Sequence, residues 1–284
     1  MTKELNGQEL AGFVKERQAH VVRAMKSRKV FPKLVIIRDS DNPVITKYVN
    51  LKIHYGNDIG VDVEDCKVTN IEEAKEAVRK ANDDSSVSGI IVQLPLADTA
   101  HTDEVVNLIV PKKDVDGLSQ MYSNNTSSAE YANHGKLLPK RIFESATATA
   151  INWLLAGHDI DLSDKKIALV GRGRLVGAPL ARMWQISGYD VTVFHHNSDL
   201  SKLRDYDVVV SATGVPHLIT NDMIKPGAVI VDAGTASEDG VLVGDVDDSV
   251  RNRTDLKAIT PVRGGVGPLT VAVLFEDVIQ AAEL

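Results

Sequence analysis

The sequence has one cysteine, Cys66, among 284 residues. An internal disulfide is therefore excluded, and so is a metal site built from several cysteines. Aromatic residues make up only 5% of the chain, so aliphatic side chains must fill the core. The longest apolar runs are the length of strands, far short of the ~20 residues that a membrane-spanning helix needs.

The sequence also lacks a concentration of positive charge. The net charge is −7, and no run of Lys and Arg marks a surface for nucleic acid. The first residues, Met1 to Glu4, lack the apolar core of a signal peptide. We therefore expect a soluble, cytoplasmic protein with no nucleic acid and no membrane among its partners.

Short runs rich in Val, Ile and Leu alternate with helical patterns along the chain. The expected strands cover residues 34–38, 89–94, 166–170, 191–195, 208–212 and 229–233, with a weaker candidate at 62–67. Such runs without strict alternation suit parallel strands that are buried on both faces. The order predicts an α/β fold of two domains, each with a mostly parallel sheet flanked by helices.

The predicted domain boundary lies near Lys140. Residues 117–136 show little apolar periodicity and are rich in Ser and Asn, and a helical pattern follows at 145–156. We expect a first domain at 1–140 and a second at 141–267. A C-terminal helix over 268–284, with Pro268 at its first position, is predicted to pack back on the first domain.

A glycine-rich loop follows the strand at 166–170. The loop reads Gly171-Arg172-Gly173-Arg174-Leu175-Val176-Gly177, and a helix follows it. Glycines there permit a tight turn and the close approach of a pyrophosphate to the helix N-terminus. The spacing is one residue longer than the common fingerprint, and a packing turn is the alternative. The context favours a Rossmann-like, dinucleotide-binding domain.

The end of the next strand indicates which cofactor binds. NAD sites usually place a carboxylate there, whereas this sequence has His195 and His196. Together with Arg172 and Arg174 of the glycine loop, they offer the donors and cations that a 2′-phosphate requires. We therefore predict NADP as the cofactor and no metal site. Two alternatives stay open: solvated roles for Arg174 and His196, and NAD through Asp199.

Two later turns fit the same site. The turn at 211–216 contains Thr213, and the turn at 232–235 ends in Thr235. Each follows a predicted strand, and ligands of open α/β sheets bind beyond the carboxyl ends of strands. We therefore include both threonines in the cofactor site.

The first half carries a candidate catalytic lysine. Asn42 is predicted to cap a helix that starts at Pro43 and runs to about Asn57. Tyr48 and Lys52 are four residues apart and share a face. Tyr48 could stack on an aromatic ligand while Lys52 reaches its reactive end. The alternative is a lysine stem lying over a half-buried tyrosine.

A glutamine and two aspartates add to this candidate site. Gln93 closes a buried strand, where a polar side chain must find a partner. Asp114 and Asp116 lie in a polar turn, where either could be a turn cap or bind the amino-pyrimidine edge of a bicyclic ligand. A lysine near a glutamine and a carboxylate, without metal ligands, favours acid–base chemistry.

These motifs together resemble those of the bifunctional methylenetetrahydrofolate dehydrogenase/methenyltetrahydrofolate cyclohydrolase family. The resemblance spans nearly the whole chain. It rests on Leu5–Ala11, Tyr48-x-x-x-Lys52, Val92–Leu96, Lys113–Gly117, Gly171–Pro179 and Gly264–Thr270.

The resemblance implies roles for individual residues. Lys52 would be the central catalytic residue, Gln93 would contact and tune it, and Asp116 would bind the pterin. Tyr48 would stack on the folate, while Thr147 and Gly267 would line a folate cleft between the domains. The residues that fall where the family binds NADP are Gly171, Arg172, Gly173, His196 and Thr235. The family further implies tetrahydrofolate derivatives as substrates and a homodimer.

The sequence departs from the family at several places. Ser145–Ala148 replaces a Pro-Cys-Thr-Pro stretch, in which only Thr147 survives, and Gly173 replaces a serine. Thr235-Ala236 replaces Ile-Asn, Arg263 replaces a proline, and residues 122–143 look unlike the family. A dehydrogenase-only member, a shikimate dehydrogenase-like enzyme and a non-catalytic paralogue that binds folate and NADP are the alternatives.

Overall fold

The structure, a computed structural model, describes residues 2–120, 142–238 and 241–284. The chain forms two compact units. The first unit comprises residues 14–146 and 271–284, and the second comprises residues 1–13 and 147–270. The predicted boundary near Lys140, and most of the unusual segment at 122–143, lie outside the described residues.

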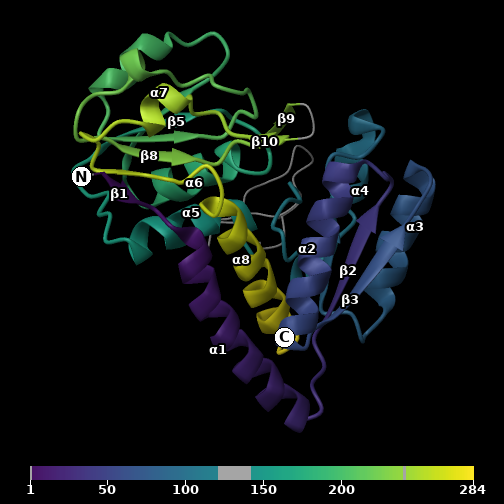
Figure 1. Ribbon diagram of the computed structural model, residues 1–284. Coiled ribbons are helices and arrows are strands. Elements are labelled where there is room, and N and C mark those ends of the chain that lie inside the picture. The colour runs from purple at the N-terminus through teal and green to yellow at the C-terminus, as the bar shows by residue number, and fades with distance from the viewer. Residues whose placement is uncertain (1, 121–141, 239–240) are drawn as a thin grey trace. The chain divides into compact units, whose positions relative to one another are not determined.

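The first unit contains a three-stranded parallel sheet in the order β3-β2-β4. Its strands are β2 (Lys33–Arg38), β3 (Asp62–Lys67) and β4 (Gly89–Val92), and its helices include α2 (Pro43–Ile59), α3 (Ile71–Asp83) and α4 (Thr102–Val106). Short 3₁₀ turns lie at η1 (Thr99–His101) and η2 (Pro111–Lys113). In Figure 1, α2 and α3 lie on opposite sides of β2 and β3. The sheet is therefore the middle of three layers.

The two faces of this sheet have different coverings. On one face, Val35 and Ile37 of β2 join Val78 of α3 and Val105 of α4 in one buried cluster. On the other, a Cβ added at Gly89 of β4 would lie 3.1 Å from a Val278 methyl carbon. Val278 belongs to α8 (Val266–Ala281), so the C-terminal helix covers this face. Alternating side chains of a strand point to opposite faces, which explains the division.

The second unit contains a six-stranded, fully parallel sheet in the order β1-β11-β8-β7-β5-β6. Its strands are β1 (Lys3–Glu4), β5 (Lys166–Val170), β6 (Asp190–Phe194), β7 (Val208–Ser211), β8 (Val229–Asp232) and β11 (Ala258–Ile259). Its helices are α5 (Ala146–Gly157), α6 (Gly177–Ile186) and α7 (Asp248–Arg251), with 3₁₀ turns η3 (Leu200–Asp205) and η4 (Asn221–Met223). A hairpin is formed by β9 (Ala236–Glu238) and β10 (Val241–Val243). In Figure 1, α7 lies on one side of β5 and β8, and α5 and α6 lie on the other.

The α/β prediction with mostly parallel sheets is confirmed, and the differences lie at the ends of elements. β4 ends at Val92 rather than at residue 94, although Gln93 N still donates to Ile37 O (2.8 Å). α8 begins at Val266, so Pro268 is its third residue rather than its first. Proline is tolerated there because first-turn N–H groups have no partner within the helix. β1 pairs with β11, so the first residues extend the second sheet, unlike the predicted division at 1–140.

The chain passes between the two units three times. It crosses within α1 (Gly7–Ser27), at the start of α5, and within α8. Each unit is therefore assembled from separated stretches of sequence. None of the helices in the described ranges combines the length and apolar character needed to span a membrane.

Candidate active site

Helix α2 positions Tyr48 and Lys52. Asn42 caps the helix, as predicted, because its Oδ1 accepts from Val44 N at 2.8 Å, and Pro43 is the first helical residue. The helix ends at Gly60, whose φ of 84° is the left-handed conformation that favours glycine. Tyr48 and Lys52 lie one turn apart, and both are half-buried.

Lys52 is held by Gln93 at the end of β4. Lys52 Nζ donates to Gln93 Oε1 at 2.8 Å. Gln93 Nε2 donates to Leu94 O at 3.1 Å, which orients the amide so that its oxygen points to the lysine. The polar side chain at the end of a buried strand has therefore found its partner in Lys52.

The two aspartates of the following turn have different tasks. Asp114 is buried, and its carboxylate accepts from Leu118 N (3.3 Å) and Ser119 N (3.1 Å). Asp114 is therefore the turn cap. The Asp116 carboxylate instead interacts electrostatically with the Lys52 ammonium. Of the two predicted candidates, Asp116 is the one that the fold brings to the lysine.

Lys113, in the same motif, has a structural role. It is buried, and its ammonium donates to three main-chain oxygens at the C-terminal end of α3 and just beyond it: Ala81 O (2.9 Å), Asn82 O (2.8 Å) and Asp84 O (2.7 Å). Terminal carbonyls of a helix lack partners within the helix and carry partial negative charge. The lysine therefore anchors the turn that carries Asp116.

Burial weakens the charged forms of both Lys52 and Asp116. Desolvation lowers the pKa of Lys52, and the Asp116 carboxylate partly opposes that change. Desolvation likewise raises the pKa of Asp116, with Lys52 opposing. An amine with a lowered pKa has a larger neutral fraction near pH 7, and a neutral amine can accept a proton.

Asp277 of α8 is a third ionisable group near this pair, and the sequence analysis missed it. Burial, Glu276 and Asp116 together raise the pKa of Asp277 to about 8. Gly89 allows the segments that carry Asp116 and Asp277 to come close together. A Cβ added at Gly89 would lie 2.8 Å from a methyl carbon of Val115 and 3.1 Å from one of Val278, and these two valines are the neighbours of Asp116 and Asp277 in the sequence. An acidic pair within an otherwise apolar helix was the available signal.

A polar network joins α1, α2 and α8 beside this group. Tyr55, three residues after Lys52, donates its hydroxyl to Gln18 Oε1 (2.8 Å) and stacks on Phe275 with ring centroids 5.1 Å apart. Gln18 is buried, and its Nε2 donates to Ala272 O (2.8 Å) and Glu276 Oε2 (2.9 Å). These bonds hold the part of α2 just beyond Lys52 against α8.

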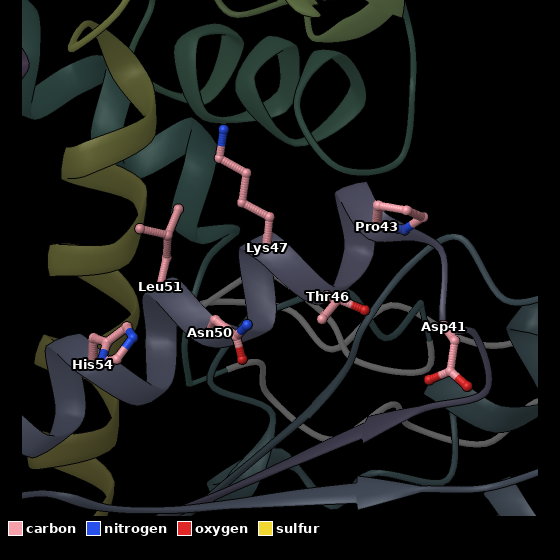
Figure 2. A pocket seen from close by; sticks show the side chains of 7 residues that line it. All are labelled: Asp41, Pro43, Thr46, Lys47, Asn50, Leu51 and His54. Atoms are coloured by element: carbon pink, nitrogen blue, oxygen red, sulfur yellow. The ribbon is translucent and has the colours of Figure 1, made fainter. Parts of the chain in front are cut away.

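A shallow pocket lies on the other side of α2. Figure 2 shows its lining side chains, six from α2 and one from the residue stretch before it. They are Asp41, Pro43, Thr46, Lys47, Asn50, Leu51 and His54. Their spacing of three and four residues defines one helix face, and neither Tyr48 nor Lys52 belongs to it. This pocket is therefore separate from the lysine–glutamine pair.

The glycine loop of the second unit shows which of its glycines the fold requires. Gly171 has φ 107°, and a Cβ there would lie 2.5 Å from Ala212 O. A Cβ at Gly177 would lie 2.2 Å from Gly171 O. At Gly173, in contrast, an added Cβ meets nothing within 4 Å. The outer glycines shape the turn, and the middle one borders open space that a phosphate can enter.

The carboxyl end of β6 offers donors rather than a carboxylate. His195 and His196 are exposed, with ring centroids 5.7 Å apart, and Arg172 is also exposed. Asp199 caps η3, because its Oδ1 accepts from Ser201 N (3.1 Å) and Ser201 Oγ (2.6 Å). These residues therefore suit a phosphate at the end of β6 better than a ribose hydroxyl pair.

The turns after β7 and β8 are organised by a residue that the sequence analysis missed. Thr213 donates from its main-chain N (2.7 Å) and its Oγ1 (2.9 Å) to Asp245 Oδ2. Thr235, in contrast, lies exposed three residues beyond the end of β8. The partnership of Thr213 with Asp245 spans 32 residues and has no signal in the local sequence.

The predicted residues thus fall into two sets. Tyr48, Lys52, Gln93 and Asp116 belong to the first unit. Thr147 and Gly267 belong to the second, together with the cofactor candidates at 171–174, 196, 213 and 235. A Cβ at Gly267 would meet nothing within 4 Å. Each set therefore lies within one of the two units.

The chain matches two family models that together cover most of its length. The catalytic domain of tetrahydrofolate dehydrogenase/cyclohydrolase matches residues 5–116, and its NAD(P)-binding domain matches residues 145–284. "Bifunctional protein FolD" of Lactobacillus helveticus is 37% identical over 287 residues, covering 99% of this chain and 97% of that protein. The chain belongs to the tetrahydrofolate dehydrogenase/cyclohydrolase family.

Solved structures of this tetrahydrofolate dehydrogenase/cyclohydrolase family share the fold throughout. The bifunctional FolD enzyme of Campylobacter jejuni superposes with a TM-score of 0.88 and 32% identity, covering 100% of this chain and 99% of the other. The FolD of Trypanosoma brucei, solved with NADP and an inhibitor, gives a TM-score of 0.86 and 28% identity, covering 99% and 97%. Neither family-model range includes 117–144, the stretch containing the segment that looked unlike the family.

Proposed function

We propose that this protein oxidises 5,10-methylenetetrahydrofolate with NADP and hydrolyses the methenyl product to 10-formyltetrahydrofolate. Family membership over nearly the whole chain supports both activities. The observation that carries the proposal is the bond from Lys52 Nζ to Gln93 Oε1, with Asp116 close enough to interact with the same ammonium. An enzyme that had lost the hydrolase would have no need of this buried arrangement.

The dehydrogenase half depends on the second unit. The residues that would hold NADP are the glycine loop at 171–174, His196 at the end of β6, and the turns carrying Thr213 and Thr235. The open space at Gly173 and the donors at the end of β6 fit a cofactor with a 2′-phosphate. When bound, NADP supplies the hydride acceptor for the one-carbon bridge.

The hydrolase half depends on Lys52. Water adds to the methenyl carbon, N5 takes up one of the water's protons as its bond to that carbon breaks, and the other proton is released. Lys52, with its pKa lowered by burial, can accept that proton as a neutral amine. Gln93 accepts one Nζ–H bond and so fixes where the amine points. Asp116 would bind the amino-pyrimidine edge of the pterin, and its charge would limit how far the pKa of Lys52 falls.

The remaining assignments rest on the family resemblance. Tyr48 would stack on the folate ring system from the same face of α2 as Lys52. Thr147 and Gly267 would also contact the substrate. The proposal also includes a homodimer in the cytoplasm.

The first experiment separates the two activities. Oxidation of methylenetetrahydrofolate is followed spectrophotometrically with NADP and with NAD, and decay of methenyltetrahydrofolate is followed without cofactor. We expect both reactions, with NADP preferred. Lys52→Met should lower the hydrolysis rate by at least about 100-fold because the proton acceptor is lost, while folate binding is largely retained.

Lys47→Met is the matched control. Lys47 lies on the same helix but lines the separate pocket shown in Figure 2. The Lys47→Met variant should hydrolyse methenyltetrahydrofolate at the wild-type rate. Unchanged hydrolysis in Lys52→Met would contradict the catalytic assignment, and a wild-type protein without either reaction would contradict the proposed function as a whole.

A further inference from the structure

Asp245 is a buried carboxylate that the proposed mechanism leaves unused. It lies two residues after β10 and is fully buried. Its Oδ2 accepts three hydrogen bonds: from Ser211 Oγ (2.7 Å), Thr213 N (2.7 Å) and Thr213 Oγ1 (2.9 Å). Asp245 therefore holds the turn that leaves the carboxyl end of β7.

The other oxygen of Asp245 faces the turn after β8. A Cβ at Gly234 would lie 1.9 Å from Oδ1, so only glycine fits there. Among the described residues, no hydrogen-bond donor reaches this buried Oδ1. One carboxylate thus touches the turns that follow two neighbouring strands, β7 and β8.

A second carboxylate, that of Asp232, lies close to Asp245 and has a different structural role. Asp232 accepts from Asp245 N (3.1 Å) and Val246 N (3.0 Å), and it pairs with Arg251. A Cβ at Gly244 would lie 2.0 Å from Asp232 Oδ2. Asp232 therefore joins β8 to the segment at 244–246, and Arg251 balances its charge. The β7 turn is held by Asp245 instead.

The Thr213 hydroxyl is used within the protein for its one proton and for one of its two acceptor positions. It donates to Asp245 and accepts from Val215 N (3.1 Å). The part of this turn that a cofactor can meet is consequently its exposed main chain at Gly214, which has φ 70°. The position of that main chain depends on the bonds that Asp245 accepts.

The strand order indicates which part of the cofactor meets these turns. The glycine loop follows β5, and the donors for a 2′-phosphate follow β6, on one side of it. A dinucleotide crosses such a sheet at the glycine loop, so its other half extends over the opposite neighbours. Those neighbours are β7 and β8, whose turns therefore face the nicotinamide half.

We propose that Asp245 is a positioning residue of the dinucleotide site, which sets the β7 and β8 turns to receive the nicotinamide half of NADP. This inference rests on the proposed function for the identity of the cofactor. Asp245 touches the turns and not the reacting atoms, so it acts through the main chain around Gly214 and Gly234.

The test is Asp245→Asn in the full-length protein, with NADP binding measured by calorimetric titration. The asparagine oxygen can still accept from Ser211 and Thr213, but the charge is lost and an amide group replaces Oδ1 beside Gly234. We expect the dissociation constant for NADP to rise by about 10- to 100-fold, the cost of weakening hydrogen bonds to a charged group. KM for NADP should rise with it, while methenyl hydrolysis, which needs no NADP, stays at the wild-type rate.

Three further variants guard against a merely structural effect. Thr213→Ser keeps the hydroxyl and should bind NADP nearly as the wild type does, whereas Thr213→Val should weaken binding in the same direction as Asp245→Asn. Asp247→Asn is the matched control, since Asp247 caps α7 through Ser249 N (2.8 Å) and its other carboxylate oxygen faces His217, beyond the β7 turn at 211–216. It should bind NADP normally.

Unchanged NADP affinity in Asp245→Asn would overturn the inference. So would an equal loss of NADP binding and of methenyl hydrolysis, because that would show general misfolding. A wild-type protein that binds NADP without turnover would contradict the proposed function, and the titration would still decide the role of Asp245.

Discussion

Single side chains at the candidate active site form a small electrostatic system. The Asp116 carboxyl interacts both with the Lys52 ammonium and with the Asp277 carboxyl, in a region where burial disfavours every charged form. The two carboxyls repel each other when both are ionised. Burial is the main cause of the raised pKa of Asp277, with Glu276 and Asp116 adding to it, and the raised pKa keeps that carboxyl largely neutral near pH 7.

The titration of Asp277 predicts a stability change with pH. Its pKa is 3.8 in an unfolded chain and about 8 in the folded protein, so the folded state binds more protons between these values. Wild-type stability should therefore fall, relative to Asp277→Asn, as the pH rises from about 4 to about 8. Each pH unit contributes at most about 1.4 kcal/mol, and we expect a total of a few kcal/mol.

Urea unfolding at a series of pH values measures this difference. Asp62→Asn, an exposed position at the start of the edge strand β3, is the control and should parallel the wild type. A constant gap between wild type and Asp277→Asn from pH 4 to pH 8 would show that Asp277 is not titrating in this range.

At the scale of elements, the glycine loop before α6 contains one glycine that the fold requires, Gly177, and one that it does not, Gly173. Gly177→Ala places a Cβ against Gly171 O, which is backbone and cannot move cheaply. We expect a loss of about 1–3 kcal/mol of unfolding free energy. Gly173→Ala adds its methyl to open space, and Gly173 does not have positive φ, so its stability should change by less than about 1 kcal/mol.

Thermal and urea unfolding of both variants check this contrast. The second readout is NADP titration, in which Gly177→Ala should bind weakly because the turn is distorted. Equal stability of the two variants would mean that the loop relaxes around either methyl group.

Elements were predictable where their signal was long and local. Runs such as 166–170 and 208–211 are apolar and β-branched, and they were recognised within a residue of their true ends. The cap at Asn42 placed the start of α2 at Pro43, and the predicted end near Asn57 lies two residues before the observed end at Ile59. β1 and β11 were missed because two residues carry no periodicity, and their pairing joins the two ends of the sequence.

The candidate site was predictable only in part, for a related reason. Lys52, Gln93 and Asp116 stand in recognisable motifs, so the resemblance identified them. Without the resemblance, the residues themselves could not distinguish Asp114 from Asp116, because the choice depends on which carboxylate meets the N–H groups of Leu118 and Ser119. Asp245 acts through neighbours distant in the chain, so no local pattern marked it, whereas the acidic pair of Glu276 and Asp277 within an apolar helix was a local signal that went unused.

At the scale of the whole molecule, the last residues complete the first unit rather than trail from the second. Phe275 and Val278 of α8 are fully buried, and Phe275 stacks on Tyr55 of α2. Ending the chain after Thr270 removes both. We expect the first unit to lose more than about 5 kcal/mol, since each lost core side chain costs about 2–5 kcal/mol, and to stop hydrolysing methenyltetrahydrofolate.

Ending the chain after Ala282 is the matched control. It removes only Glu283 and Leu284, which are exposed. Circular dichroism melting should show a wild-type transition for this variant and a lost or lowered one for the shorter chain. A normal melt after removal of residues 271–284 would show that α8 is dispensable for the first unit.

Two aspartate–glycine pairs cross each other here: Asp232 lies against Gly244, and Asp245 lies against Gly234. This arrangement also limits which mutations can be inherited. Each carboxylate occupies the space that a side chain at the opposite glycine would need. A mutation at either glycine is therefore harmful while the facing aspartate remains, and a lineage can leave this arrangement only by changing both members of a pair. Among descendants of this gene, we expect the four codons to be kept as a set or replaced in pairs.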